Sequence, residues 1–263
     1  MKRTKNPAKE AEYRKRATDL VAQMTLHEKV SQMLSWAPAI ERLGIPAYNW
    51  WSEGIHGIGR AGTATVFPQA IGMAAAFDED MMEQVGNAVG VEARGKYNMC
   101  RAHGDRDIFK GLTVWAPNIN IFRDPRWGRG HETYGEDPFL TSRLGVRFVE
   151  GMQGDDPDYL QAAACAKHFA VHSGPESDRH HFNAIVSKQD LWETYLPAFR
   201  ALVKEAGVEA VMGAYNRTNG EPCCGSKTLL KDILRDKWHF DGHVTSDCWA
   251  IKDFHTGHMV TDG

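Results

Sequence analysis

The second half of the sequence alternates short apolar runs with longer stretches whose apolar residues recur at helical spacing. The short runs predict β-strands within residues 113–121, 162–171, 208–216 and 243–248. The stretches between them predict helices over residues 137–152, 188–206 and 226–238. Strands that alternate with helices of this length are typical of βαβ units, which build a parallel sheet.

The first half adds one strand and a long helix to this pattern. Residues 47–53 predict a strand, and residues 78–97 predict a helix that begins with acidic side chains. Residues 9–20 mix charges of both signs, which indicates a helix with a solvated face. Residues suited to cap helix N-termini precede other predicted helices: Ser187, Ser226, and Thr25 with Glu28 as a capping box.

The number of strands bears on the fold class. A closed (β/α) barrel needs eight parallel strands and about 250 residues. This chain of 263 residues shows only about five or six strand patterns. No linker, low-complexity tract or short-period repeat divides it. We therefore expect one α/β domain over residues 1–263, a TIM-like (β/α) barrel that is incomplete or collapsed, with parallel strands alternating with helices.

Polar residues gather where the predicted strands end. They are Asn118 and Asn120, Lys167 and His168, Tyr215 and Asn216, and Ser246 and Asp247. In α/β folds the carboxyl ends of the strands form the edge at which ligands bind. Polar residues also begin ordinary loops, but four strands repeat the pattern here. We therefore expect a ligand site at this edge.

Composition narrows the classes of protein. Hydrophobic residues make up 42% and charged residues 25% of the chain, enough for a globular core. The net charge of −3 and the isoelectric point near 6.5 give no general attraction to nucleic acid or anionic membranes. The first sixteen residues are basic, Lys2 and Arg3 included, but no apolar run follows as in a signal peptide. The sequence also contains no apolar run of about 18 residues, the length needed to span a bilayer.

The cysteines indicate the redox setting. Five cysteines, two of them adjacent, are a poor framework for disulfides. A reducing, cytoplasmic location is therefore expected. Cys165 lies inside an apolar run, where a buried structural thiol is the ordinary case, and the sequence holds no G-x-S-x-G nucleophile motif.

Two further chemistries find little support. The sequence GIGRAG at residues 57–62 matches a dinucleotide-binding fingerprint, but Pro68 and β-branched residues follow where a helix should begin. A tightly turning loop is the better interpretation. The twelve histidines include no set with the spacing of a zinc site. We expect neither a metal nor another cofactor.

Carbohydrate chemistry fits the sequence better. Eight tryptophans offer flat apolar faces for sugar rings, although most single tryptophans belong to protein cores. Trp50, Trp51, Trp127 and Trp249 lie within a few residues of charged groups, which suits a polar cleft. Hydrolysis of a glycosidic bond usually requires two carboxyl groups, one acid and one nucleophile or base.

The sequence resembles family 3 of the glycoside hydrolases, in its β-glucosidase and β-xylosidase branch. The resemblance covers nearly the whole chain. Its most specific motifs are YNWWSEGIHG (48–57), WAPNINIFRDPRWGRGHETYGEDP (115–138), KHFAVHSGPESDRHHFNA (167–184), MGAYN (212–216) and TSDCWA (245–250).

The resemblance implies a role for each matched position. Asp247 would be the catalytic nucleophile, which attacks the anomeric carbon and forms a glycosyl-enzyme intermediate. Positions that hold the hydroxyls of the terminal sugar in relatives match Glu53, Arg129, Lys167, His168 and Arg179. Tyr215 matches a tyrosine close to the nucleophile, and Trp249 could wall the sugar site.

Glu53 bears on which sugar is bound. Many glucosidases of the family carry Asp at this place, whereas xylosidase-like members resemble the Trp-Trp-Ser-Glu pattern seen here. The longer side chain would reach toward the place of a hexose C6 hydroxymethyl group, a difference of ~1–3 kcal/mol. The resemblance therefore favours xylose and leaves glucose open.

The resemblance also implies a second α/β domain, which supplies the acid/base glutamate in this branch. We expect the barrel of this chain to be truncated near its C-terminal end and that domain to be absent. Alternatives remain open: a β-glucosidase proper, an inactive sugar-binding fragment, and a single-domain β-N-acetylglucosaminidase that uses Asp178 and His180. The expected partners are an oligosaccharide or glycoside substrate and a second copy of the chain.

Overall fold

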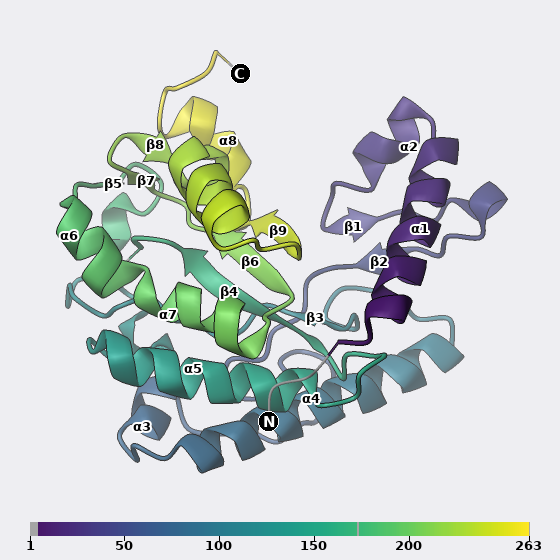
Figure 1. Ribbon diagram of the computed structural model, residues 1–263, viewed down its shortest axis with the longest axis horizontal. Coiled ribbons are helices and arrows are strands. Elements are labelled where there is room, and N and C mark those ends of the chain that lie inside the picture. Colours follow the sequence, from purple (N-terminus) through teal and green to yellow (C-terminus); the bar gives the residue numbers. More distant parts are fainter. Residues whose placement is uncertain (1–4, 173, 263) are drawn as a thin grey trace.

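A parallel sheet of four strands lies at the centre of the computed structural model, which describes residues 5–172 and 174–262 (Figure 1). The strands are β3 (Thr113–Val114), β4 (Ala163–Phe169), β6 (Ala210–Gly213) and β9 (His243–Ser246). Lys2 and Arg3 of the basic N-terminus, and Ser173 of the 167–184 motif, lie outside the described residues.

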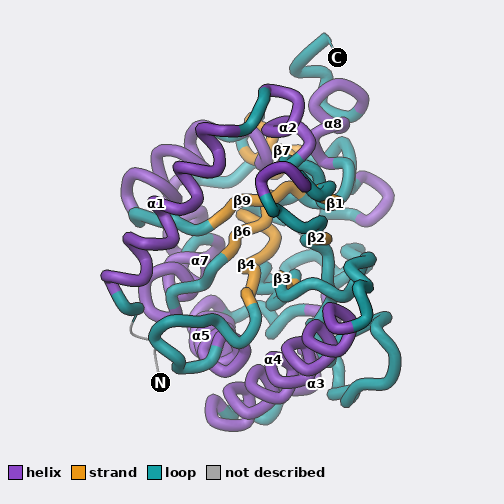
Figure 2. The backbone as a smooth tube through the Cα atoms, turned by 90° about the vertical axis from the view of Figure 1, so that its right-hand side faces the viewer, coloured by secondary structure: helices purple, strands orange, loops and turns teal. Residues whose placement is uncertain are grey.

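The strands follow one another in chain order, β3-β4-β6-β9, and every pair is parallel (Figure 2). A parallel bridge between Ser52 and Val114 extends this order to residue 52. The sheet curls as a half-barrel. This confirms the predicted α/β class and the incomplete TIM-like barrel, since sequential parallel strands with helical crossovers are the unit of such barrels.

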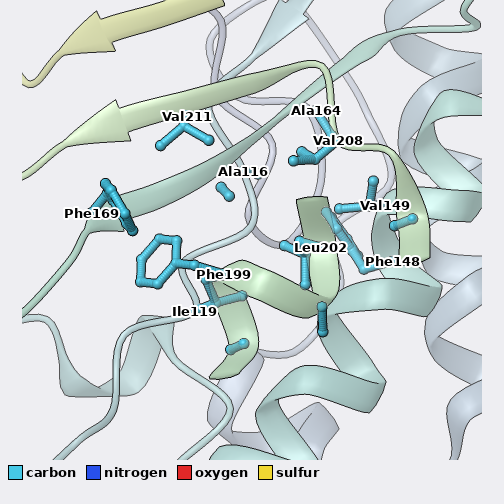
Figure 3. Packing of buried hydrophobic residues seen from close by; sticks show 14 of the residues in the cluster. Ala116, Ile119, Phe148, Val149, Ala164, Phe169, Phe199, Leu202, Val208 and Val211 are labelled. Carbon is cyan, nitrogen blue, oxygen red and sulfur yellow. The ribbon is translucent and has the colours of Figure 1, made fainter. Parts of the chain in front are cut away.

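Helices cover the outer face of this sheet. The longest are α4 (Glu79–Ala102) and α5 (Pro138–Gln153), which lie side by side beneath the strands in Figure 1. Between α5 and the sheet lie large apolar side chains, among them Phe148, Phe169 and Leu202 (Figure 3). Removing these surfaces from water supplies the main driving force for this packing.

The predicted helix starts are confirmed by their hydrogen bonds. The side chains of Ser187 and Ser226 accept from the backbone N–H groups of Asp190 and Leu229, respectively. Thr25 forms a full capping box with Glu28. These bonds satisfy N–H groups that no helical carbonyl reaches.

Two predicted helices have π-helical parts. Residues 188–206 form α6 (Lys188–Asp190), a π-turn (Leu191–Tyr195), α7 (Pro197–Ala201) and a second π-turn (Leu202–Ala206), and Lys227–Lys237 is π-helical. Pro197 has no N–H, so the α-helical hydrogen bond at this position cannot form, and the Leu196 N–H reaches back to the Leu191 carbonyl instead.

Two predicted strands are shorter than expected. Pro117 offers no N–H, so the run 113–121 pairs regularly only over β3 and resumes as a bridge at Asn118. Of residues 47–53, β2 (Tyr48–Asn49) pairs antiparallel with β1 (Trp36–Ala37) rather than with the main sheet.

The remaining elements are short or peripheral. Helix α1 (Pro7–Gln23) stands to one side of the sheet and buries none of its residues, as its mixed charges predict (Figure 1). The others are α2 (Leu26–Ser31), η1 (Glu41–Leu43), α3 (Ala70–Ala74), η2 (Gly130–Glu132), η3 (Glu176–Asp178), β5 (Asn183–Ala184), β7 (Arg217–Thr218), β8 (Glu221–Pro222), η6 (Cys223–Gly225) and α8 (Ala250–Thr256).

Other expectations from the sequence can be compared with this fold. Residues 57–62 form a loop, as predicted, and the next helix begins only at Ala70. All five cysteines lie among the described residues as free thiols. Among the described helices, none is both long and apolar enough to cross a membrane. The cytoplasmic location stays a prediction.

Candidate active site

Asp247 lies directly after β9, at the carboxyl edge of the sheet. Its backbone N–H donates to the carbonyl of Gly213 on β6 (3.2 Å), which fixes the residue against the neighbouring strand. The side chain is buried, with 7% of the residue exposed. Oδ1 accepts from the Cys248 N–H (2.7 Å), whereas Oδ2 has no hydrogen-bond partner among the described residues. Oδ2 is therefore a buried acceptor that no group of the described chain satisfies.

Two opposing effects act on the pKa of the Asp247 carboxyl group. Burial raises the pKa of its carboxyl group, because the charged form loses its hydration. The positive charges of Arg129 and Lys167 act in the other direction. Without these two cations the carboxylate would be protonated more readily and would be a poorer nucleophile.

His168, at the end of β4, is held in one tautomer. Asn120 donates both amide hydrogens to the carbonyls of His168 and Ala170, so its Oδ1 must face the imidazole, where it accepts from Nδ1–H (2.9 Å). The Nε2 lone pair then accepts from Arg129 Nη1 (3.0 Å). Burial and the charge of Arg129 lower the pKa of His168 well below its usual value. His168 is thus a neutral acceptor, 3.6 Å from Asp247 Oδ2.

Arg129 is fixed by Glu132, one turn later in η2. The carboxylate accepts from Nε (2.8 Å) and from Nη2 (2.6 Å) in a bidentate pair. Burial is the largest effect on the pKa of Glu132 and acts to raise it, but the hydrogen bonds and charge of Arg129 together leave the pKa lowered. Glu132 therefore stays ionised and orients the guanidinium toward His168.

Glu53 follows Ser52 at the β3 side of the site. Its Oε1 accepts from Trp51 Nε1–H (2.7 Å), and its Oε2 lies 3.8 Å from the ammonium of Lys167. Lys167 is 3% exposed, so Glu53 is one of the charges that balance a buried cation. The Glu53 side chain is one third exposed.

Tyr215 and Arg179 form a second pair near Asp247. Burial and the negative charge of Asp247 raise the pKa of the Tyr215 hydroxyl, which therefore stays protonated. The Arg179 guanidinium lies over the Tyr215 ring at 5.7 Å and forms an ion pair with Glu176. His180 contacts the same ring edge-on, at 4.7 Å between centroids.

Trp249 occupies a different environment from the other candidates. It has left-handed backbone geometry (φ 66°), which turns the chain between Asp247 and α8. It is largely exposed (79%). Its assignment to the wall of a sugar site stays a prediction.

The structure adds residues to which the sequence assigned no role. Asn120, Trp51 and Glu132 hold His168, Glu53 and Arg129, respectively. His172 repeats the arrangement of His168, with Nδ1 bonded to Asn216 Oδ1 (3.1 Å) and a pKa lowered to about 3 by burial. The Arg129–Glu132 spacing of three was visible in the sequence as a helical ion pair, whereas the Asn–His pairs join residues far apart.

Other chemistries fit this cluster less well. No three or more His, Cys, Asp or Glu side chains within the described ranges are placed to hold a metal ion. His180 Nδ1 bonds to Asp253 on α8 (2.8 Å), and this carboxylate, not Asp178, orients its ring. The Asp178–His180 dyad of the acetylglucosaminidase alternative is therefore not formed.

The site thus joins a buried carboxylate with one unpaired oxygen to two cations, two further carboxylates and aromatic rings, at the carboxyl edge of a curled parallel sheet. This combination of fold and site is that of a glycoside hydrolase domain. The chain belongs to glycosyl hydrolase family 3, since residues 16–262 match the glycosyl hydrolase family 3 N terminal domain. The resemblance stated from the motifs is confirmed.

Individual relatives support this assignment. The chain is 52% identical to a xylan 1,4-beta-xylosidase of Xylanibacter ruminicola over 93% of its own length and 29% of that protein. It superposes on a GH3 exo-beta-xylosidase solved with a xylobiose aziridine activity-based probe (TM-score 0.86, 35% identity, 95% and 33% of the two chains). It also superposes on the beta-glucosidase DesR of Streptomyces venezuelae, solved with D-glucose (TM-score 0.76, 35% identity, 92% and 30%). The chain spans about a third of each relative.

Proposed function

We propose that this chain is the nucleophile-bearing domain of a retaining, exo-acting β-glycosidase that releases terminal non-reducing β-linked xylose, with glucose as the alternative sugar. The observation that carries the proposal is the unpaired Oδ2 of Asp247, buried beside Arg129 and Lys167 at a strand end. The xylosidase names of the relatives support the choice of sugar.

In the proposed first step, Asp247 Oδ2 attacks the anomeric carbon as the bond to the leaving oxygen breaks, which gives a glycosyl–Asp247 ester. The attacking carboxyl must be ionised. Because burial raises its pKa, the rate of this step should fall on acidification at a higher pH than for an exposed aspartate. Water then hydrolyses the ester in a second displacement, which restores the original configuration.

The leaving oxygen needs a proton. The carboxylates near Asp247 in the described chain are already engaged, Glu53 with Trp51 and Glu132 with Arg129. We propose that a glutamate of a second α/β domain of the whole protein supplies this proton, as the family resemblance implies. An activated leaving group would make the first step independent of that donor.

The neighbouring side chains are proposed to hold the sugar. Glu53, Lys167 and Arg129 offer charged partners to adjacent hydroxyls, and the Arg179–Tyr215 pair closes the other side. The one lone pair of His168 Nε2 accepts from Arg129, so His168 can accept from a sugar hydroxyl only when that bond is given up. Glu53 would reach the place of a hexose C6 group, which favours a pentose.

The test uses activated 2-deoxy-2-fluoro-β-xyloside and its glucoside counterpart, followed by peptide mass spectrometry. We expect a covalent label on Asp247, formed faster by the xyloside. The matched control is Asp247→Asn, which keeps the shape of the side chain and should take no label. A folded sample that neither reagent labels would favour the alternative of a protein that only binds sugar.

A further inference from the structure

The Glu53 carboxylate is held at both oxygens by groups of different kinds. Trp51 Nε1–H donates to Oε1 at 2.7 Å, a short distance for a bond from a neutral donor to a charged acceptor. Lys167 Nζ lies 3.8 Å from Oε2, beyond hydrogen-bond distance. The direct hydrogen bond that fixes the carboxylate therefore comes from Trp51.

Trp51 is itself fixed in position. Its ring stacks on the buried ring of Trp115 (5.3 Å between centroids, 18° between planes), and its edge meets Phe109 at 5.6 Å. Its backbone N–H donates to Asn49 Oδ1, and its carbonyl accepts from the Phe109 N–H. These contacts fix both the ring and the backbone of Trp51. The indole N–H therefore points in a single direction.

The chain itself brings the two side chains together. Residues 51 and 53 are two apart in extended backbone, so both project to the same side. The Ser52 carbonyl between them accepts from the Trp115 N–H (2.8 Å), which anchors this segment to the sheet. The WWSE sequence thus places a fixed donor next to a partly exposed carboxylate.

We propose that Trp51 is a positioning residue that sets the preference for pentose over hexose by holding Glu53 extended toward the place of the C6 group. The inference rests on the proposed function of the same site and deepens it. With the N–H in place, the carboxylate cannot retreat from a hydroxymethyl group. Without it, Glu53 can swing toward Lys167 and make room for a hexose.

A direct stacking role for Trp51 under the sugar ring is the competing account. Trp115 already covers one face of the indole, and the N–H is occupied by Glu53. If Trp51 only stacked on sugars, its loss would weaken xylose and glucose alike. The ratio of the two sugars therefore separates the accounts.

The experiment compares Trp51→Phe with the matched control Trp50→Phe, which removes the neighbouring indole. The Trp50 ring contacts the rings of Tyr48 and His243. Two ratios are measured on each folded sample: the labelling rates of Asp247 by the 2-fluoro-xyloside and 2-fluoro-glucoside, and the Kd values for xylose and glucose. We expect Trp51→Phe to lower both preferences for xylose about tenfold, and Trp50→Phe to leave them within about twofold.

The same measurements in a Glu53→Asp background test whether Trp51 acts through Glu53. The shorter side chain can no longer reach the indole N–H of Trp51. Trp51→Phe should then cause no further change in either ratio. Glu53→Asp also leaves the packing of Trp51 intact, which covers the case of a Trp51→Phe protein that does not fold. Trp51→His, which keeps a ring N–H, should retain more of the preference.

An unchanged ratio in Trp51→Phe, an equal change in Trp50→Phe, or an equal effect of Trp51→Phe in both backgrounds would overturn the inference. So would a wild-type protein that prefers neither sugar. Failure of the proposed function appears differently: Asp247 takes no label from either reagent, whereas the Kd ratios still respond to Trp51.

Discussion

At the scale of single residues, two asparagines decide the tautomers of two histidines that burial keeps neutral. Asn120 and Asn216 each spend their amide hydrogens on backbone carbonyls and turn Oδ1 toward a histidine Nδ1. Each imidazole is thereby left with an unprotonated Nε2. In His168 this nitrogen accepts a hydrogen bond from Arg129, which keeps the guanidinium beside Asp247.

Asn120→Asp should reverse this arrangement. A carboxylate beside Nδ1 stabilises the imidazolium, so the pKa of His168 should rise and Nε2 should become a donor that no longer accepts from Arg129. We expect a slower labelling of Asp247, by about tenfold or more, and a change in the nitrogen chemical shifts of His168. Asn216→Asp is the matched control, since it changes the same contact at His172. Equal labelling rates in the two variants would contradict this role of Asn120.

His172 predicts a pH dependence of stability. Its pKa is lowered to about 3 in the folded chain and is 6.5 when unperturbed. Between these values the unfolded state binds the proton and the folded state does not, so the free energy of unfolding falls as the pH drops below about 6.5. One such group contributes about 1.4 kcal/mol per pH unit.

Urea unfolding at several pH values checks this prediction. His172→Asn keeps a donor for Asn216 and carries no titrating group, so its free energy of unfolding should fall less steeply on acidification than that of the wild type. Parallel curves for the two proteins between pH 6 and pH 4, as a rough window within that range, would show that His172 does not titrate on unfolding.

At the scale of elements, close contact between helices depends on glycine. A Cβ at Gly151 of α5 would lie 2.1 Å from the Glu83 carbonyl oxygen of α4, and one at Gly86 would lie 2.3 Å from the Phe148 carbonyl oxygen. The two helices can approach this closely only because both positions lack a side chain. Helix α5 in turn packs its apolar side chains against the sheet that carries the site.

Gly151→Ala should therefore destabilise the fold, by roughly 1–3 kcal/mol, because the backbone of α4 must move. Gly95, also on α4, has nothing within 4 Å of its Cβ position. Gly95→Ala should stabilise the helix by about 0.5–1 kcal/mol. Thermal unfolding of both variants measures the contrast. Shifts of the same sign would show that helical propensity, not contact, governs both positions.

At the scale of the whole molecule, the half-barrel has an open side. β9 is the last strand of the described sheet, and α1 buries none of its residues and is tied to the segment before β9 by the Arg14–Asp241 ion pair. Large apolar side chains are exposed on α2, just after it, and near the C-terminal end of the described chain: Leu26, Val30, Met33, Leu34, Trp249 and Met259. Strand edges and apolar patches of this kind favour association with other chains.

The isolated chain should therefore self-associate. We expect the mean mass measured by light scattering to rise with protein concentration, and to fall when Met33 and Leu34 are both replaced by Lys. Val91→Lys, at an exposed apolar residue of α4, is the control for added charge. A monodisperse monomer at every concentration would contradict this prediction.

The sequence by itself determined the features that depend on neighbours along the chain. Alternating strands and helices, the caps at Ser187 and Ser226, and a polar residue at the end of each strand follow from local spacing and local hydrogen bonds. Its motifs also identified the family. The extent of the 113–121 strand was misjudged, although Pro117 stood in the sequence as its cause.

Only the tertiary structure decided which distant residues meet. The Asn120–His168 pair joins residues 48 apart, and the contact of Gly151 with α4 joins two helices. Such contacts depend on strand order and helix crossing, which no local pattern encodes. The direction of the Trp51 indole likewise depends on Trp115 and Phe109. The sequence supplied the reactive groups, and the packing of the sheet set their protonation, partners and orientation.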